Sequence, residues 1–242
     1  MSGLPKASVG AAGGAGDPEA VCAALAPLLG DERRRRIEEV IEARLASLTV
    51  VVENLHDPRN GAAVLRSAEA FGLQVVHVVE AAERFRFSPT VSQGCEKWLD
   101  VERHPTFARA EARLRAAGFA LYAAVPDAAV SLERLDFTRP AAVLVGNEHD
   151  GLTAEAARAA DVQFTIPMAG MTRSFNLSVA AAVTLAQATA RRRAALGKAG
   201  DLDERARLTL RARFYAASVC GADEVVARFT SAARVPVDTA AG

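Results

Sequence analysis

Residues 48–72 read LTVVVENLHDPRNGAAVLRSAEAFG, a β-branched apolar run followed directly by a helical pattern that ends at a glycine. Valine-rich runs of this kind are typical of buried strands, and glycine often stands just past the end of a helix. The same alternation recurs along the chain as far as Arg193. It predicts an α/β fold, a mostly parallel sheet with helices on both faces.

Hydrophobic periodicity gives the expected position of each element. Strands are expected at 48–55, 74–79, 119–125, 141–146 and 162–166. Helices are expected at 60–71, 106–117, 153–160 and from Ser174 to Arg193. Thr153 is expected to cap the third of these helices, because threonine is a favoured N-cap residue.

Helical patterns flank this core on both sides. Four consecutive arginines, Arg33 to Arg36, precede apolar residues at helical spacing and predict a basic amphipathic helix. Further helical pattern runs from Asp201 to Phe229. The expected organisation is a disordered tail (1–17), a basic helical extension (18–47), an α/β domain (48–196) and a C-terminal helical extension with a tail (197–242).

Charge gives no global sign of a nucleic-acid partner. The chain has 29 Lys+Arg and 29 Asp+Glu residues, so it lacks the overall basic field that attracts polyanions. Contact with nucleic acid must therefore be local. Arginine runs at 33–36 and 191–193 could supply it, since the guanidinium fork suits phosphate, and solvated helix faces are the alternative explanation.

Several other classes of site and location are disfavoured. The three cysteines form no C-x-x-C pair and the four histidines show no ligand spacing, so neither a disulfide framework nor a metal site is expected. No secretory signal pattern is present at the N-terminus. The most apolar helical stretch, 177–190, is shorter than the roughly 20 residues of a membrane span. We expect a soluble, cytoplasmic protein.

Two loops that follow strands carry polar residues where a ligand is expected. Parallel α/β sheets bind ligands at the carboxyl ends of their strands. The first loop leads to Asn60 at a helix N-terminus, with Arg66 about two turns further on. The second places Glu148 between two glycines. Asn60 is equally well explained as a helix N-cap, and Glu148 as a partner for the backbone donors of its own turn.

A third loop reads IPMAGMTRSFNLSVA at residues 166–180 and runs straight into a helix. Proline, glycine and methionine there allow the backbone to present its N–H and C=O groups to a flat ligand. Ser174 and Asn176 are the polar pair of this loop. Capping of the following helix is the simpler explanation for Ser174.

In order and spacing, these three segments resemble the three motifs of the SpoU/TrmH group of the SPOUT methyltransferase superfamily, from about Leu48 to Arg192. The resemblance implies a C-terminal deep trefoil knot, a rare exception to ordinary chain topology, and a homodimer with active sites at the subunit interface. It implies methyl transfer from S-adenosylmethionine to a ribose 2′-oxygen of RNA. The flanking helices resemble those of members that act on guanosine 18 in the tRNA D-loop, which is the expected substrate. Ribosomal RNA, another tRNA position, or a catalytically silent RNA-binding or assembly role are the alternatives.

The resemblance also implies a role for individual residues. The family's catalytic residues correspond to Arg66, Asn60, Glu148, Ser174 and Asn176. The methyl donor would lie on backbone groups of Ala123, Gly146, Ile166, Met168 and Phe175. Arg66 would also bind RNA, and the position of Arg33, Arg34 and Arg36 beside the core suits contact with the RNA backbone. Ala123 and Phe175 depart from the threonine and leucine that relatives usually carry, which affects the shape of the donor pocket if their side chains touch the adenine.

Overall fold

The computed structural model describes residues 17–80, 94–147 and 149–232. These residues form two compact units: a sheet unit (43–201) and a helical unit (17–42 with 202–232). The tail expected at 1–17 lies outside the described residues except for Asp17. None of the described helices is long and apolar enough to pass through a lipid bilayer.

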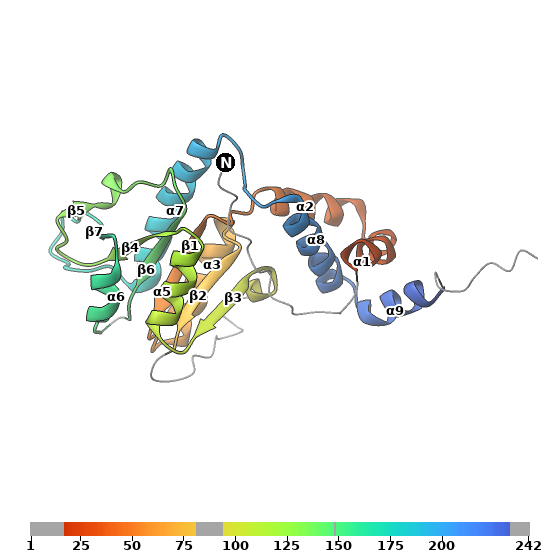
Figure 1. Cartoon of the computed structure of the whole chain (residues 1–242), viewed down its shortest axis with the longest axis horizontal. Helices are drawn as coiled ribbons and strands as arrows, with labels where there is room; N and C mark the ends of the chain where they lie inside the picture. The colour runs from red at the N-terminus through yellow and green to blue at the C-terminus, as the bar shows by residue number, and fades with distance from the viewer. Residues whose placement is uncertain (1–16, 81–93, 148, 233–242) are drawn as a thin grey trace, which may run out of the picture. The chain divides into compact units, whose positions relative to one another are not determined.

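The sheet unit is built on one parallel sheet. Its strands are β1 (Leu48–Glu53), β2 (Val75–Val79), β3 (Asp100–His104), β4 (Ala120–Ala124), β5 (Val130–Ser131), β6 (Ala141–Val145) and β7 (Val162–Thr165). They lie in the order β3-β2-β1-β6-β4-β7-β5, and every neighbouring pair is parallel (Figure 1). The prediction of a parallel α/β sheet is confirmed, although β3 and β5 were not predicted.

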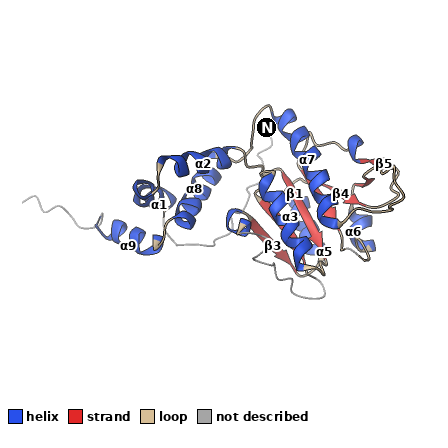
Figure 2. Ribbon diagram, turned by 180° about the vertical axis from the view of Figure 1, so that it is seen from behind, coloured by secondary structure: helices blue, strands red, loops and turns tan. Residues whose placement is uncertain are grey.

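Helices cover both faces of this sheet (Figure 2). One face is packed by α3 (Pro58–Ala70) and α7 (Leu177–Leu196). The other is packed by α5 (Phe107–Ala116) and α6 (Ala154–Ala159). Every residue of β1 and β6 is therefore buried, as is usual for the middle of a sheet covered on both sides. Short 3-10 helices are η1 (Ala26–Leu28), η2 (Cys95–Trp98) and η3 (Leu132–Arg134).

The start of α3 differs from the expected one. The helix begins at Pro58, and the Asp57 carboxylate caps it by accepting a hydrogen bond from the Arg59 backbone N–H at 2.8 Å. Proline fits the first helical position because its φ is already helical and it has no N–H to leave unpaired. Asn60 therefore lies inside the first turn, and its interpretation as an N-cap is wrong.

The start of α7 also differs. The helix begins at Leu177 and not near Ser174, and Asn176 is its N-cap, with Oδ1 accepting from the Ser178 backbone N–H at 2.9 Å. The interpretation of Ser174 as a cap is wrong. The expected cap at Thr153 is confirmed, since its Oγ1 accepts from Ala156 N–H at 3.2 Å.

A buried arginine anchors the C-terminal part of α7. Arg192 is 4% exposed, and its Nε donates to Ser47 Oγ at 2.7 Å while Nη1 donates to the Thr138 carbonyl. Its Nη2 lies 3.9 Å from Asp201 Oδ2, which also accepts from Ser47 Oγ. A buried guanidinium needs such partners to offset its loss of water. Arg192 is thus a structural link and not an exposed cation at a helix end.

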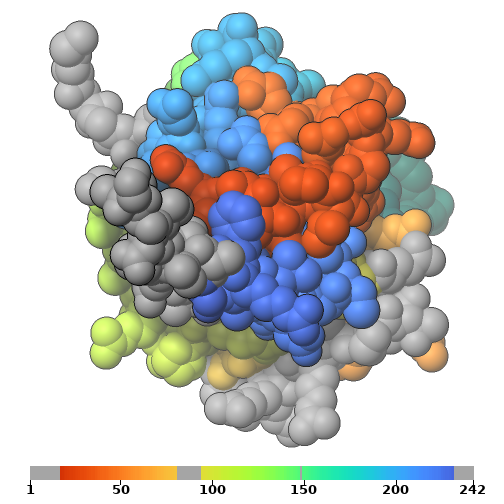
Figure 3. All heavy atoms as spheres, turned by 90° about the vertical axis from the view of Figure 1, so that its right-hand side faces the viewer, coloured from red at the N-terminus to blue at the C-terminus, as the bar shows by residue number. Residues whose placement is uncertain are grey.

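The helical unit combines segments from both ends of the chain. Its helices are α1 (Pro18–Leu25), α2 (Asp31–Glu42), α8 (Glu204–Ser218) and α9 (Ala222–Ala232). α1 packs on α8 and α9, and α2 packs on α8, so N- and C-terminal segments lie side by side (Figure 3). The basic amphipathic helix expected from the Arg33 to Arg36 run is confirmed as α2. The segment 18–47 does not form one continuous helix, because Pro27 and Gly30 interrupt it between α1 and α2.

Candidate active site

A cavity of about 310 Å³ opens at the carboxyl ends of β4, β6 and β7. Its wall comes from residues after each of these strands and from the loop that precedes α7. Val125, Phe164 and Ile166 give it an apolar side, while Asn147 and Ser174 add polar groups. An apolar wall with a few polar groups is the usual composition of a small-molecule site, and its place at the strand ends is the one predicted for this fold.

Gly146 lies where the chain folds back on itself at this wall. A Cβ on Gly146 would be 1.9 Å from the Gly151 carbonyl carbon and 2.1 Å from the Leu152 nitrogen, so only glycine fits. Asn147 and Gly151 exchange backbone hydrogen bonds of 3.1 Å in both directions. The turn is therefore closed tightly over the end of β6, and backbone forms this part of the cavity wall.

A buried carboxylate holds the far end of the same turn. Glu53, at the end of β1, is 2% exposed and accepts hydrogen bonds of 2.8 Å from both the backbone N–H and Oγ1 of Thr153. Thr153 in turn caps α6. Glu53 was not predicted as a site residue, because its only signal in the sequence is an acidic residue at the end of an otherwise apolar strand.

The expected catalytic residues are only partly brought together. Asn176 Nδ2 donates to Asn60 Oδ1 at 3.1 Å, which joins the third loop to the first turn of α3, and Ser174 lines the cavity. Glu148 lies outside the described residues. Arg66 is exposed on α3 and is not among the described residues that line the cavity.

Arg66 has a weak electrostatic effect within its own chain. Burial, the largest effect, raises the pKa of the Cys95 thiol to about 11, and the positive charge of Arg66 opposes this rise only weakly. Cys95 begins η2, which contacts α3.

Four of the five expected donor-binding residues line the cavity: Gly146, Ile166, Met168 and Phe175. Ala123 does not. It is fully buried in β4 and packs in the core beneath α5 and α6, while the following residues, 124–126, line the cavity. Ala123 can therefore affect the cavity only through the position of its strand.

Three of the four arginines expected to bind RNA lie in the helical unit and have polar partners there. Arg34 pairs with Asp31, Arg36 Nη1 lies 3.5 Å from Glu39 Oε2, and Arg33 Nη2 donates to Ser218 Oγ at 3.2 Å. Exposed ion pairs of this kind contribute at most about 1 kcal/mol. Such weak pairs leave the guanidinium groups able to exchange partners with a phosphate.

Comparison with known proteins gives the family. The SpoU rRNA Methylase family model matches residues 47–186. The tRNA (guanosine(18)-2'-O)-methyltransferase of Thermus thermophilus is 41% identical over 163 residues, 67% of this chain and 84% of that protein. The crystal structure of the A. aeolicus TrmH/SpoU tRNA modifying enzyme matches with a TM-score of 0.70 and 26% identity, over 78% of this chain and 98% of that one.

A further solved structure contains a cofactor. The SpoU methyltransferase AviRb from Streptomyces viridochromogenes, in complex with AdoMet, matches with a TM-score of 0.55 and 30% identity, over 63% of this chain and 62% of that one. The family match at 47–186 covers more than half of the 242 residues, and all of the cavity-lining residues lie within it. The chain belongs to the SpoU rRNA methylase family.

Proposed function

We propose that this protein transfers a methyl group from S-adenosylmethionine to the ribose 2′-oxygen of guanosine 18 in tRNA, in the cytoplasm. The observation that carries the proposal is the cavity at the ends of β4, β6 and β7, walled by residues of the second and third motif loops. A relative named for this activity is 41% identical over most of its length, and another family member holds AdoMet.

The cavity suits a donor with a flat ring and polar ends. Its volume of about 310 Å³ lies in the range of small-molecule sites. Ile166, Met168 and Phe175 would pack against the ring, and Gly146, which has no side chain, leaves backbone groups accessible. When bound, S-adenosylmethionine supplies a methyl group on a sulfonium centre, which is a good leaving group.

The polar residues at the cavity would position the ribose. Ser174 lines the cavity, and the bond between Asn176 and Asn60 fixes the loop that carries it. We assign the same task to Glu148, which lies in the second loop between Gly146 and Gly151. Holding the 2′-oxygen in line with the methyl group is the main requirement of such a transfer.

Arg66 would bind RNA and activate the hydroxyl. Arginine stays protonated in proteins, because its pKa exceeds about 12, so it is unsuited to accept a proton. We therefore assign it the phosphate next to the target ribose and the polarisation of the 2′-hydroxyl. That phosphate or a water molecule would then take the proton as the oxygen attacks.

A homodimer would bring Arg66 to a cavity. In its own chain Arg66 is exposed and does not line the cavity, so we propose that it serves the cavity of a partner subunit. An apolar face of α7 supports this: Val179 is 44% and Val183 41% exposed. Phe175, in the loop before the helix, is 42% exposed. Exposed apolar residues gathered in this way often mark a protein interface.

The remaining features of the family complete the proposal. We propose that the segment carrying α7 forms a deep trefoil knot and that residues 48–196 are the methyltransferase domain. The extensions at 18–47 and 197–242 would then contact tRNA, with Arg33, Arg34 and Arg36 on phosphates. The match to the A. aeolicus TrmH/SpoU structure over 78% of this chain supports this organisation.

Methyl incorporation from labelled donor into unmodified tRNA tests the function. We expect incorporation into tRNA and none into the same tRNA with 2′-deoxyguanosine at position 18. The Arg66→Ala variant should lose at least about 100-fold in kcat/KM, whereas Arg158→Ala, a matched exposed arginine on α6, should keep its activity. Equal incorporation into the 2′-deoxy tRNA, or incorporation only into ribosomal RNA, would refute guanosine 18 of tRNA as the substrate. Equal activity of Arg66→Ala and wild type would refute the role of Arg66.

A further inference from the structure

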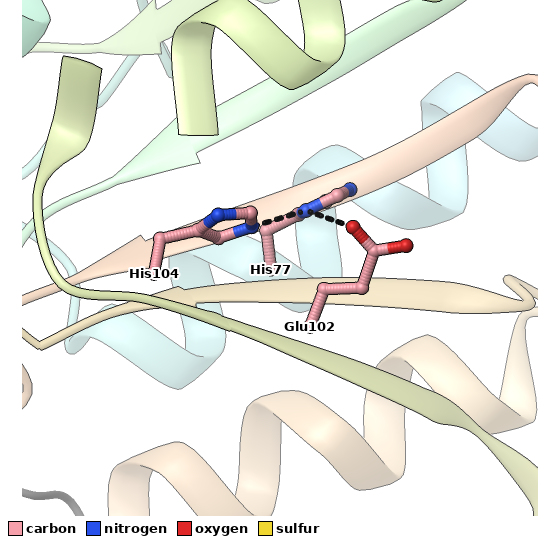
Figure 4. A group of neighbouring side chains, drawn as sticks. All are labelled: His77, Glu102 and His104. Atoms are coloured by element: carbon pink, nitrogen blue, oxygen red, sulfur yellow. Dashed lines mark hydrogen bonds and ion pairs between the residues drawn. The ribbon is translucent and has the colours of Figure 1, made fainter. Parts of the chain in front are cut away.

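Two histidines and a glutamate gather at one edge of the sheet (Figure 4). His77 lies on β2, and Glu102 and His104 lie on the edge strand β3. The register pairs His77 with Glu102. Glu102 and His104 are two residues apart and so point to the same face of the sheet. The cluster is separated from β6 and its cavity by β1.

The potential ligand atoms lie close to one another. His77 Nδ1 is 2.9 Å from His104 Nε2 and 3.6 Å from Glu102 Oε2, and the three atoms all lie within 4.8 Å of one another. Ligands at about 2.1 Å from a tetrahedral zinc ion are roughly 3.4 Å apart. The two short distances lie on either side of this value, so small side-chain movements would allow all three atoms to bind one ion.

We propose that His77, Glu102 and His104 form a binding site for a divalent transition-metal ion, zinc in the first place, that fastens the edge strand β3 to β2. Two imidazole nitrogens and one carboxylate oxygen are a common ligand set for zinc and for related metals. The hydrogen shared between the two imidazoles would move to the other nitrogen of its ring, which leaves both rings neutral and both lone pairs directed at the metal. A fourth position is open to water, because Glu102 and His104 are only half-buried.

A cation faces the cluster. Arg113 on α5 has its Nε 3.5 Å from Glu102 Oε2 and its Nη2 3.5 Å from Oε1. Arg113 can remain hydrogen-bonded to Oε1 of Glu102 while Oε2 binds the metal, since ligating carboxylates are commonly hydrogen-bonded in turn. Its charge nevertheless weakens metal binding, so removing it should increase the affinity. A structural histidine pair without metal would give no such increase.

Zinc titration of the metal-stripped full-length protein tests the site. We expect about one high-affinity zinc ion per chain and a higher melting temperature on zinc addition. Glu102→Gln and His104→Ala, both on the edge strand, should each weaken binding at least about tenfold, and Arg113→Ala should tighten it severalfold. Melting of each variant in chelator shows whether it is folded.

Control variants separate this site from other zinc ligands. Cys220 is exposed, and the rings of His56 and His149 lie 6.1 Å apart. These residues are possible zinc ligands outside the proposed cluster. If the cluster is the high-affinity site, Cys220→Ser and His56→Ala should leave the high-affinity binding unchanged. Wild-type protein without such binding, binding lost in either control variant, or binding unaffected by Glu102→Gln would each overturn the proposal. None of these outcomes bears on methyl transfer, which is measured separately.

Discussion

Asn176 Nδ2 donates a hydrogen bond to Asn60 Oδ1 at 3.1 Å, joining the loop before α7 to the first turn of α3 across 116 residues of sequence. The same side chain caps α7, because its Oδ1 accepts from the Ser178 backbone N–H at 2.9 Å. One residue thus sets both the start of a helix and the position of the loop that carries Ser174 and Phe175.

Substitution of Asn176 by serine separates these two tasks. Serine caps helices about as well as asparagine, but it is too short to reach Asn60. We expect Asn176→Ser to change the free energy of unfolding by less than about 0.5 kcal/mol and to lower kcat/KM about ten- to hundredfold by misplacing the loop. Asn176→Ala should in addition lose about 1 kcal/mol of stability. Urea denaturation and methyl incorporation measure the two effects, and full activity of the serine variant would show that the link is dispensable.

The bond between Glu53 and Thr153 predicts an effect on donor affinity. Glu53→Gln keeps the shape of the side chain but replaces the charged carboxylate by a neutral amide. It should therefore weaken the hydrogen bonds to Thr153 that fix the turn at the cavity wall. We expect the donor KM to rise roughly fivefold or more, with a smaller change in kcat at saturating donor. Glu155→Gln, an exposed substitution on α6, is the control. A fall in kcat alone would contradict a role in holding the donor site.

Gly146→Ala tests the closeness of the turn to the end of β6. A methyl group placed 1.9 Å from the Gly151 carbonyl carbon forces the turn to move, at a cost of about 1–3 kcal/mol of stability. We expect donor binding, measured by calorimetry, to fall below detection. Gly170→Ala is the matched control, because a Cβ there meets nothing within 4 Å. Normal binding by the Gly146 variant would mean that this turn does not wall the donor site.

The carboxylate of Asp161 predicts a pH effect on stability. Burial acts to raise its pKa, but hydrogen bonds from Arg115 Nη1 at 2.6 Å and Leu121 N–H at 2.7 Å outweigh burial and lower it below the usual 3.8. A lowered folded-state pKa stabilises the fold above the unfolded-state value, and this stabilisation is lost as the pH falls through the folded-state value. Asp161→Asn should therefore lower the melting temperature at pH 7, and the difference from wild type should shrink below about pH 4. A difference that is independent of pH would contradict this.

The sheet could be predicted because its central strands are apolar runs and its helices carry clear end signals. The edge strand β3, with the sequence DVERH, could not, because its residues are mostly half-exposed and polar. The two-residue strand β5 has too few residues to show a pattern. Two helices begin at residues other than the expected ones, for local reasons. Proline takes the first position of α3, and asparagine caps α7.

The candidate site could be predicted only where it follows from loops at strand ends. The resemblance of their loops to known motifs singled out Asn60, Ser174 and Asn176, of which Ser174 lines the cavity and the other two are hydrogen-bonded to each other. The contact between His77 and His104 depends on the register of β2 against β3, which the sequence pattern does not contain. Burial of Glu53 and its bond to a residue 100 positions away depend likewise on the pairing of distant segments.

A subunit-mixing experiment decides whether Arg66 serves its own cavity or that of a partner. Chains carrying Arg66→Ala and chains carrying Gly146→Ala are expected to be nearly inactive as homodimers. If Arg66 acts on the partner's cavity, a heterodimer of the two has one site with an intact cavity and an intact arginine, and it should regain about half of the wild-type activity. If Arg66 acts within its own chain, both sites carry a defect and activity stays absent. Purification through two different tags isolates the heterodimer from the two homodimers. Val183→Asp in both chains should abolish the recovery if the exposed apolar face of α7 forms the proposed subunit interface, because a charge there would separate the subunits.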